Sequence, residues 1–195
     1  MTGWAFGLAL LLSVGGYLLL SGFLTTYRRY RGTRVITCPE TFAPAAVRLD
    51  ALRAAHWAAV SGEPALRLSQ CSRWPERSGC DQGCLTQIAD SPESCLVRTI
   101  VSSWYEGKHC VYCHEAIGEI VWHEQPPALR GPDKVSREWK EIRAENLPEV
   151  FRTHEPVCWK CYITEGFRHD HPELVVERHR PAEPKIALEP STTTY

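Results

Sequence analysis

Charged side chains are missing from the start of this chain, and they return with one sign only. Residues 3–24 carry no charged side chain, and the first 34 residues contain four arginines but no acidic residue. Because the whole 195-residue chain has a formal charge of −1, the part that follows these arginines carries −5. An acidic soluble part argues against binding to the phosphate backbone of nucleic acids.

The motifs of several enzyme classes are also missing. The sequence contains no G-x-S-x-G, no phosphate-cradling glycine loop and no H-E-x-x-H, which removes the usual reasons for naming an enzyme. Charged residues make up 23% of the chain and hydrophobic residues 44%, so whole-chain disorder and a fibrous repeat are excluded as well. The composition therefore predicts a folded protein in which no catalytic residue can be named.

The uncharged stretch is long enough to span a membrane as a helix. Its 22 residues would extend about 33 Å, close to the thickness of the hydrocarbon layer. A cleaved signal peptide would need a basic segment before the apolar run and a small-x-small cleavage site, and neither is found. The basic residues Arg28, Arg29, Arg31 and Arg34 follow the run instead, so the positive-inside rule places the rest of the chain in the cytoplasm. We therefore expect residues 1–34 to be a single-pass anchor with a basic stop-transfer flank in the plasma (inner) membrane.

Hydrophobic patterning and turn signals predict a small α+β domain after the anchor. Extended runs at residues 34–37 and 45–49, joined by a turn at Cys38-Pro39-Glu40-Thr41, are expected to form a β-hairpin, and a third extended run is expected at residues 66–68. A β-hairpin or a small meander is expected from residues 117–122 and 135–142. Helices are expected at residues 51–60 with Asp50 as the cap, from Pro92 to Gly107, at residues 146–152 and after Cys161. We expect two cysteine-rich subdomains, residues 35–107 and 108–180, and a disordered tail at residues 181–195.

Two C-x-x-C motifs are the clearest chemical signal. Cys110 and Cys113 form the first motif, and Cys158 and Cys161 form the second. In a reducing compartment, clustered thiols are more often metal ligands or redox groups than structural disulfides. Two C-x-x-C turns that an intervening hairpin brings together make a closed four-sulfur site of the kind that zinc prefers. This layout resembles the zinc ribbon, although the interval of 44 residues between the motifs is long for one.

A second zinc site is predicted from the earlier cysteines. We choose Cys38, Cys71, Cys80 and Cys84 as its ligands, because Cys80 and Cys84 would lie one turn apart on a helix face. Cys95 is then a buried thiol on the helix that starts at Pro92. The same thiolates could hold an iron–sulfur cluster, since spacing does not separate the two.

Two redox interpretations of the late cysteines stay open. Cys110, Cys113 and His114 also spell C-x-x-C-H, the attachment pattern of c-type haem, with His114 as the proximal ligand. Methionine occurs only at Met1, so a second axial ligand would have to be a histidine. Thiol–disulfide exchange is the other alternative, because a C-x-x-C pair can carry it when one thiol has a lowered pKa.

The segments ITCPE, CSRWPERSGC, CLVR, WYEGKHCVYC and HEPVCWKCYI occur together behind an N-terminal span. In this combination the chain resembles a group of bacterial single-pass, membrane-anchored, cysteine-rich proteins. The resemblance covers most of residues 35–178, and it implies no activity and transfers no catalytic residue. The sequence as a whole predicts one transmembrane helix and a small α+β, cysteine-rich, zinc-ribbon-like soluble domain. We expect that domain to serve as a zinc-stabilised binding module, or as an accessory subunit that meets a protein partner at the membrane.

Overall fold

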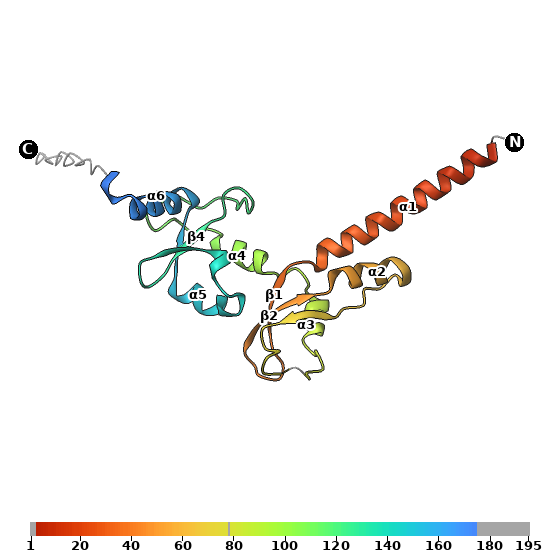
Figure 1. The fold of residues 1–195 in the computed structure, drawn as a ribbon, viewed down its shortest axis with the longest axis horizontal. Helices are drawn as coiled ribbons and strands as arrows, with labels where there is room; N and C mark the ends of the chain where they lie inside the picture. The colour runs from red at the N-terminus through yellow and green to blue at the C-terminus, as the bar shows by residue number, and fades with distance from the viewer. Residues whose placement is uncertain (1–2, 78, 175–195) are drawn as a thin grey trace, which may run out of the picture.

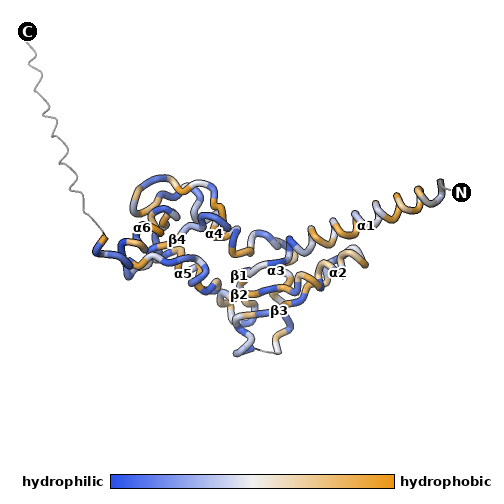
Figure 2. Tube along the Cα trace, turned by 45° about the horizontal axis from the view of Figure 1, so that its top comes forward, coloured by the Kyte–Doolittle hydropathy of each residue, from blue (hydrophilic) through white to orange (hydrophobic). Residues whose placement is uncertain are grey.

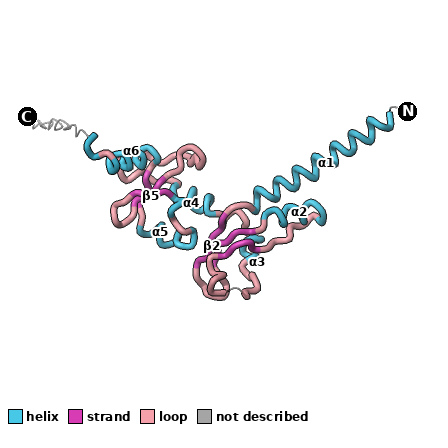
Figure 3. The backbone as a smooth tube through the Cα atoms, viewed as in Figure 1, coloured by secondary structure: helices cyan, strands magenta, loops and turns pink. Residues whose placement is uncertain are grey.

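The computed structural model describes residues 3–77 and 79–174, with one long helix and two small antiparallel sheets (Figures 1 and 3). The long helix, α1 (Gly3–Tyr30), projects away from the rest of the chain, and its surface is largely apolar (Figure 2). It is the one helix in the described chain that is long and apolar enough to cross a membrane, a property that an N-terminal signal sequence shares. The predicted tail at residues 181–195 lies outside the described residues.

The first sheet has the order β1-β2-β3. It consists of β1 (Thr33–Thr37), β2 (Pro44–Leu49) and β3 (Leu68–Cys71), with Val35 opposite Ala46 in the β1–β2 pair. The hairpin predicted around Cys38 is therefore confirmed. The third strand begins at Leu68, the last residue of the extended run predicted at residues 66–68. The inward side chains of all three strands contribute to one core, together with Tyr30 and Ile88.

Helix α2 (Ala51–Ser61) packs along the C-terminal half of α1 (Figure 1). The predicted cap is confirmed, because the Asp50 carboxylate accepts a hydrogen bond of 2.9 Å from the Arg53 amide. Gly62 ends the helix with a φ of 82°, a left-handed conformation that glycine adopts without strain. Alanines at helical spacing fill the buried face of α2 and allow the close approach of the two helices.

Arg34 in β1 is fully buried, although the sequence placed it among the basic residues of the membrane flank. Its guanidinium donates hydrogen bonds to the carbonyl oxygens of Arg29, Tyr30 and Gly32, at the end of α1, and to that of Pro92. A positive charge at a helix C-terminus is electrostatically favourable. Arg34 thus fastens the base of α1 to the domain.

Two short helices follow the first sheet. Helix α3 spans Leu85–Asp90, and α4 spans Val97–Tyr105. The predicted helix start at Pro92 is wrong, because residues 92–95 form turns and Leu96 is extended. Leu96 pairs with Arg34 in an isolated β-bridge, and this tertiary contact replaces the first helical turn.

The second sheet has the order β5-β4-β6. It consists of β4 (Ala128–Arg130), β5 (Ser136–Glu138) and β6 (Glu155–Val157). Three 3₁₀ turns and two helices complete this half: η1 (Trp139–Glu141), η2 (Ala144–Asn146), η3 (Pro172–Leu174), α5 (Leu147–Thr153) and α6 (Trp159–Asp170). The prediction of a strand at residues 117–122 is wrong. Ile117, Ile120 and Trp122 pack from a loop against the cluster around Val101, while Val121 is exposed and forms only an isolated β-bridge with Gln125.

Aromatic side chains join α4 to the second half of the chain. The Tyr105 hydroxyl donates a hydrogen bond to the Ala128 carbonyl of β4 and accepts one of 3.1 Å from the Trp139 indole. The rings of Trp104 and Phe151 stack with their centroids 5.3 Å apart. Trp104 and Trp139 therefore serve as core packing between α4 and the second half of the chain.

Candidate metal centre

The first C-x-x-C motif lies in a tight turn closed by backbone hydrogen bonds. His109 pairs with Ala116 across the turn, the Cys110 amide donates to the Glu115 carbonyl at 2.9 Å, and the His114 amide donates to the Cys110 carbonyl at 2.9 Å. His114 has a φ of 60°, which turns the chain back on itself. The turn directs the amides of Tyr112 and Cys113 at the Cys110 sulfur, which is fully buried.

The second C-x-x-C motif lies at the start of a helix, whereas the sequence predicted a turn with a helix only after Cys161. Cys158 is the N-cap of α6, and Cys161 lies in the first helical turn. The Cys158 amide donates a hydrogen bond of 3.3 Å to Cys110 Sγ, so the two motifs are joined directly. The positive end of the helix dipole favours thiolates at this place. A hairpin turn and a helix N-terminus therefore supply the four sulfurs.

The four sulfur atoms of this C-terminal cluster all lie within 4.8 Å of one another. They belong to Cys110, Cys113, Cys158 and Cys161, and the Sγ atoms of Cys113 and Cys158 are 3.8 Å apart. Four sulfurs at this separation could hold a metal ion, and thiolates are the ligands that zinc and iron–sulfur clusters share. The sequence prediction named these four residues, and the fold brings all of them together.

The thiols of the C-terminal cluster differ in the direction in which their pKa values are shifted. Burial works against ionisation of Cys110, but the amides of Cys113, Cys158 and Tyr112 outweigh it and lower the pKa of this thiol to about 7. Burial raises the pKa of Cys158, and burial with the three neighbouring thiols raises that of Cys161. Four thiolates at such short range repel one another, and a divalent cation is the group that removes this penalty.

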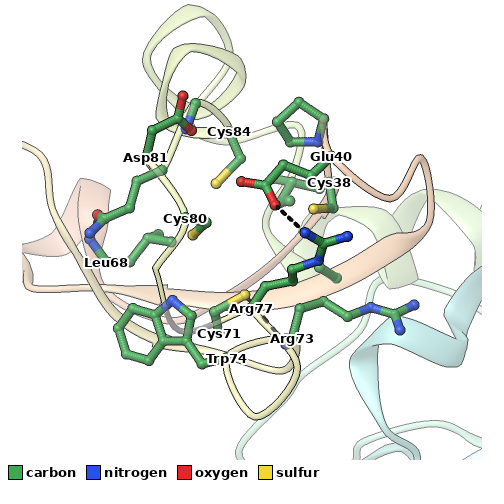
Figure 4. Close-up of a pocket in the computed structure, with 15 residues that line it drawn as sticks. Cys38, Glu40, Leu68, Cys71, Arg73, Trp74, Arg77, Cys80, Asp81 and Cys84 are labelled. Carbon is green, nitrogen blue, oxygen red and sulfur yellow. Dashed lines mark hydrogen bonds and ion pairs between the residues drawn. The ribbon is translucent and has the colours of Figure 1, made fainter.

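The earlier cysteines gather around a pocket in the first half of the chain (Figure 4). This N-terminal cluster consists of Cys38, Cys71, Cys80 and Cys84, which come from the β1–β2 turn, the end of β3 and the loop before α3. The pocket is also lined by Trp74 and by apolar residues of the sheet. Burial, followed by the nearby Cys71 and Cys80 thiols, raises the pKa of Cys84 to about 11.

Cys80 and Cys84 lie in a loop rather than on a helix face, because Gln82 takes a φ of 59° and α3 begins only after Cys84. Within the described chain, only the C-terminal cluster brings all its ligand atoms within 4.8 Å, so the N-terminal sulfurs are more widely spaced. Cys95 lies outside both clusters, half-buried in the turns before α4, where its thiol contacts the Ser91 carbonyl at 3.4 Å.

Sequence reasoning missed the residues that shape the two clusters without being ligands. The Cys158 amide donates to Cys110 Sγ, and the Thr41 hydroxyl lies close to the Cys38 thiol and lowers its pKa. No sequence motif marks either of these groups. Only the turn signal at Cys38-Pro39 pointed toward Thr41. Comparison with protein-family models, with curated proteins and with solved structures finds no match for this chain.

Proposed function

We propose that this protein is a membrane-tethered binding module, or an accessory subunit of a membrane complex, whose cytoplasmic domain is stabilised by zinc. The observation that carries the proposal is the closure of the C-terminal cluster, in which four sulfurs surround one centre. Four protein ligands complete a tetrahedral zinc site and leave no position for water or substrate. The metal is therefore structural, and the domain acts through its surface rather than through catalysis.

The membrane part of the proposal rests on α1 and on the residues that follow it. The helix is apolar and exposed along most of its length. Arg28, Arg29 and Arg31 remain available to anionic headgroups after Arg34 is withdrawn into the domain. Three basic residues on one side still favour a cytoplasmic C-terminal domain in the plasma membrane.

The alternative from another class is an electron carrier with c-type haem at Cys110, Cys113 and His114, or with an iron–sulfur cluster. Haem attachment needs both thiols of the motif to reach the vinyl groups of the porphyrin. Cys110 is fully buried, and its sulfur accepts the Cys158 amide. This arrangement favours a small ion over a porphyrin, and it equally disfavours Cys110 as the attacking thiol of a disulfide exchanger, since that role requires access.

Elemental analysis of the full chain, purified in detergent, tests the metal. We expect zinc bound to a colourless protein, and Cys110→Ser should lower the zinc content while Cys95→Ser leaves it unchanged. A Soret band would overturn the zinc proposal in favour of haem, and brown absorption with iron and acid-labile sulfide would overturn it in favour of a cluster.

Reporter fusions at the C-terminus test the orientation. A cytoplasmic reporter should be active and an export-dependent reporter inactive, in a membrane fraction that resists carbonate extraction. Release of the chain by carbonate, or activity of the exported reporter, would contradict the membrane part of the proposal.

A further inference from the structure

The turn at Cys38 repeats the geometry of the turn at Cys110. In the first turn the Cys38 amide donates to the Ala43 carbonyl at 2.9 Å and the Phe42 amide donates to the Cys38 carbonyl at 2.8 Å. The same two bonds, at the same spacing along the chain, close the turn at Cys110. The residue four positions after each cysteine is left-handed, with a φ of 52° at Phe42 and 60° at His114.

The strand pairing around the two turns also matches. Thr37, the residue before Cys38, pairs with Pro44, and His109, the residue before Cys110, pairs with Ala116. Each cysteine therefore lies at the same register of a hairpin. In each turn the amides two and three positions after the cysteine lie near its sulfur and lower the pKa of the thiol. Amides aimed at a sulfur stabilise a thiolate, which is the form that binds a metal.

The turns differ at one position, where Thr41 stands in the place that Cys113 occupies. The Thr41 hydroxyl is buried and has no hydrogen-bond partner among the described residues. It lies close enough to the Cys38 thiol to lower the pKa of that thiol. The first turn can therefore supply one sulfur to an ion instead of two. A four-sulfur site here needs three more ligands from elsewhere.

Three further thiols surround the same pocket. Cys71 ends β3, and its sulfur accepts a hydrogen bond of 3.5 Å from the Arg73 amide, a third example of an amide directed at a sulfur. Cys80 and Cys84 line the same pocket from the loop before α3 (Figure 4). An ion pair between Arg77 and Glu40, 3.8 Å between nitrogen and oxygen, joins two of the segments that carry these cysteines.

From these observations we propose that Cys38, Cys71, Cys80 and Cys84 bind a second divalent metal ion of the zinc class. The ion would draw together sulfurs that are more widely spaced than those of the C-terminal cluster. Each thiol that coordinates gives up its proton to solvent as the metal–sulfur bond forms, so no oxidant or reductant is needed. The site is independent of the C-terminal cluster, and it lies at the β1–β2 turn of the first sheet.

Metal stoichiometry of the full chain in detergent tests this second site. Native mass spectrometry and elemental analysis should find two zinc ions per chain. Cys38→Ser and Cys84→Ser should each lower the content to one, Cys113→Ser should also leave one, and Cys95→Ser should leave two. One zinc per chain in the wild type, unchanged by Cys38→Ser, would overturn the second site.

Alkylation of the wild-type protein covers the case in which a variant fails to fold. Zinc-loaded chain is treated with N-ethylmaleimide before and after a chelator, and the modified cysteines are mapped by peptide mass spectrometry. Cys38, Cys71 and Cys80, which are partly exposed, should be protected until the chelator is added, while Cys95 reacts at the same rate in both samples. Reaction of the first three at the Cys95 rate in zinc-loaded protein would contradict the proposal. If only Cys113 and Cys161 lacked protection from alkylation, the result would instead count against the C-terminal metal centre.

Discussion

The two halves of this chain use the same cysteine-bearing turn in different surroundings. In the second half, the buried core next to the turn consists of Cys110, Ala128 and Val157, and four sulfurs close over it. In the first half, the sheet, α2, α3 and the end of α1 share a core of larger apolar side chains, and the sulfurs lie at its edge around an open pocket. The second half also has an aromatic core around Val101 and Tyr105, but the buried core beside the late cysteines is small, so we expect that region to rely on metal ligation more than the first half does.

A free-energy argument supports this contrast. Burying a large aliphatic side chain contributes about 1.5–3 kcal/mol, whereas a structural zinc ion contributes on the order of 10 kcal/mol that exists only in the folded state. The first half buries Ile36, Val47, Leu49, Leu68 and Ile88 in one core. We therefore expect the first half to keep its fold without an ion, and the segments around the C-terminal cluster to depend on one more strongly.

Metal removal should give the largest difference between the halves. After chelation of the full chain in detergent, we expect amide exchange in β4, β6 and the first turn of α6 to accelerate by about 100-fold or more, because the fold there depends on the ion. Exchange in β1 and β2 should change by less than about tenfold, since the apolar core remains. Hydrogen exchange read by mass spectrometry measures both. Equal acceleration of amide exchange in the two halves would contradict the expected difference in their dependence on metal.

Substitution of Arg34 should give the next largest effect, and it acts on the first half. Arg34→Ala leaves three backbone carbonyls at the base of α1, and the carbonyl of Pro92, without their charged donor, and we expect it to lower the free energy of unfolding by about 2–4 kcal/mol. Urea denaturation followed by tryptophan fluorescence measures the change. Arg31→Ala is the matched control, because Arg31 is exposed and should change stability by less than about 0.5 kcal/mol. Similar losses in both variants would refute the role of Arg34.

Removal of the Tyr105 hydroxyl should weaken the connection between α4 and the second sheet. Tyr105→Phe keeps the ring but leaves the Ala128 carbonyl and the Trp139 indole without their partner. We expect a loss of about 1–3 kcal/mol. The same urea denaturation measures it, with Tyr112→Phe as the control, since that hydroxyl makes only a long contact of 3.3 Å. A loss below about 0.5 kcal/mol would show that the contact is not needed.

The smallest expected effect sharpens the comparison of the two turns. Thr41→Cys would place a thiol where the second turn has Cys113, and we expect it to strengthen zinc binding at the N-terminal cluster by about tenfold, which is about 1.4 kcal/mol. Competition with a chromophoric chelator measures the affinity. The more demanding test is rescue: Thr41→Cys should restore the second zinc to the Cys80→Ser variant. No rescue would mean that the two turns are alike in backbone only.

Turn and capping residues in the sequence predicted the local structure around them. The hairpin around Cys38, the Asp50 cap and Gly62 end of α2, and the Pro148 start of α5 follow from turn and capping chemistry, which acts over a few residues. The helix start at Pro92 and the strand at residues 117–122 were wrong. Leu96 pairs with Arg34 as an isolated bridge instead of starting a helix, and the segment at residues 117–122 packs as a loop against the aromatic cluster around α4. In both places a contact with a distant residue outweighs the local preference.

The sequence by itself determined that the chain has one helix able to cross a membrane and which cysteines could act together, because charge, apolar length and C-x-x-C spacing are properties of contiguous residues. Only the tertiary structure decided that α6 supplies the second pair of sulfurs, that Arg34 is withdrawn from the membrane flank, and that the turns at Cys38 and Cys110 match. These outcomes depend on contacts between residues far apart in the chain, and the cost of ordering such residues is repaid only when the whole core assembles.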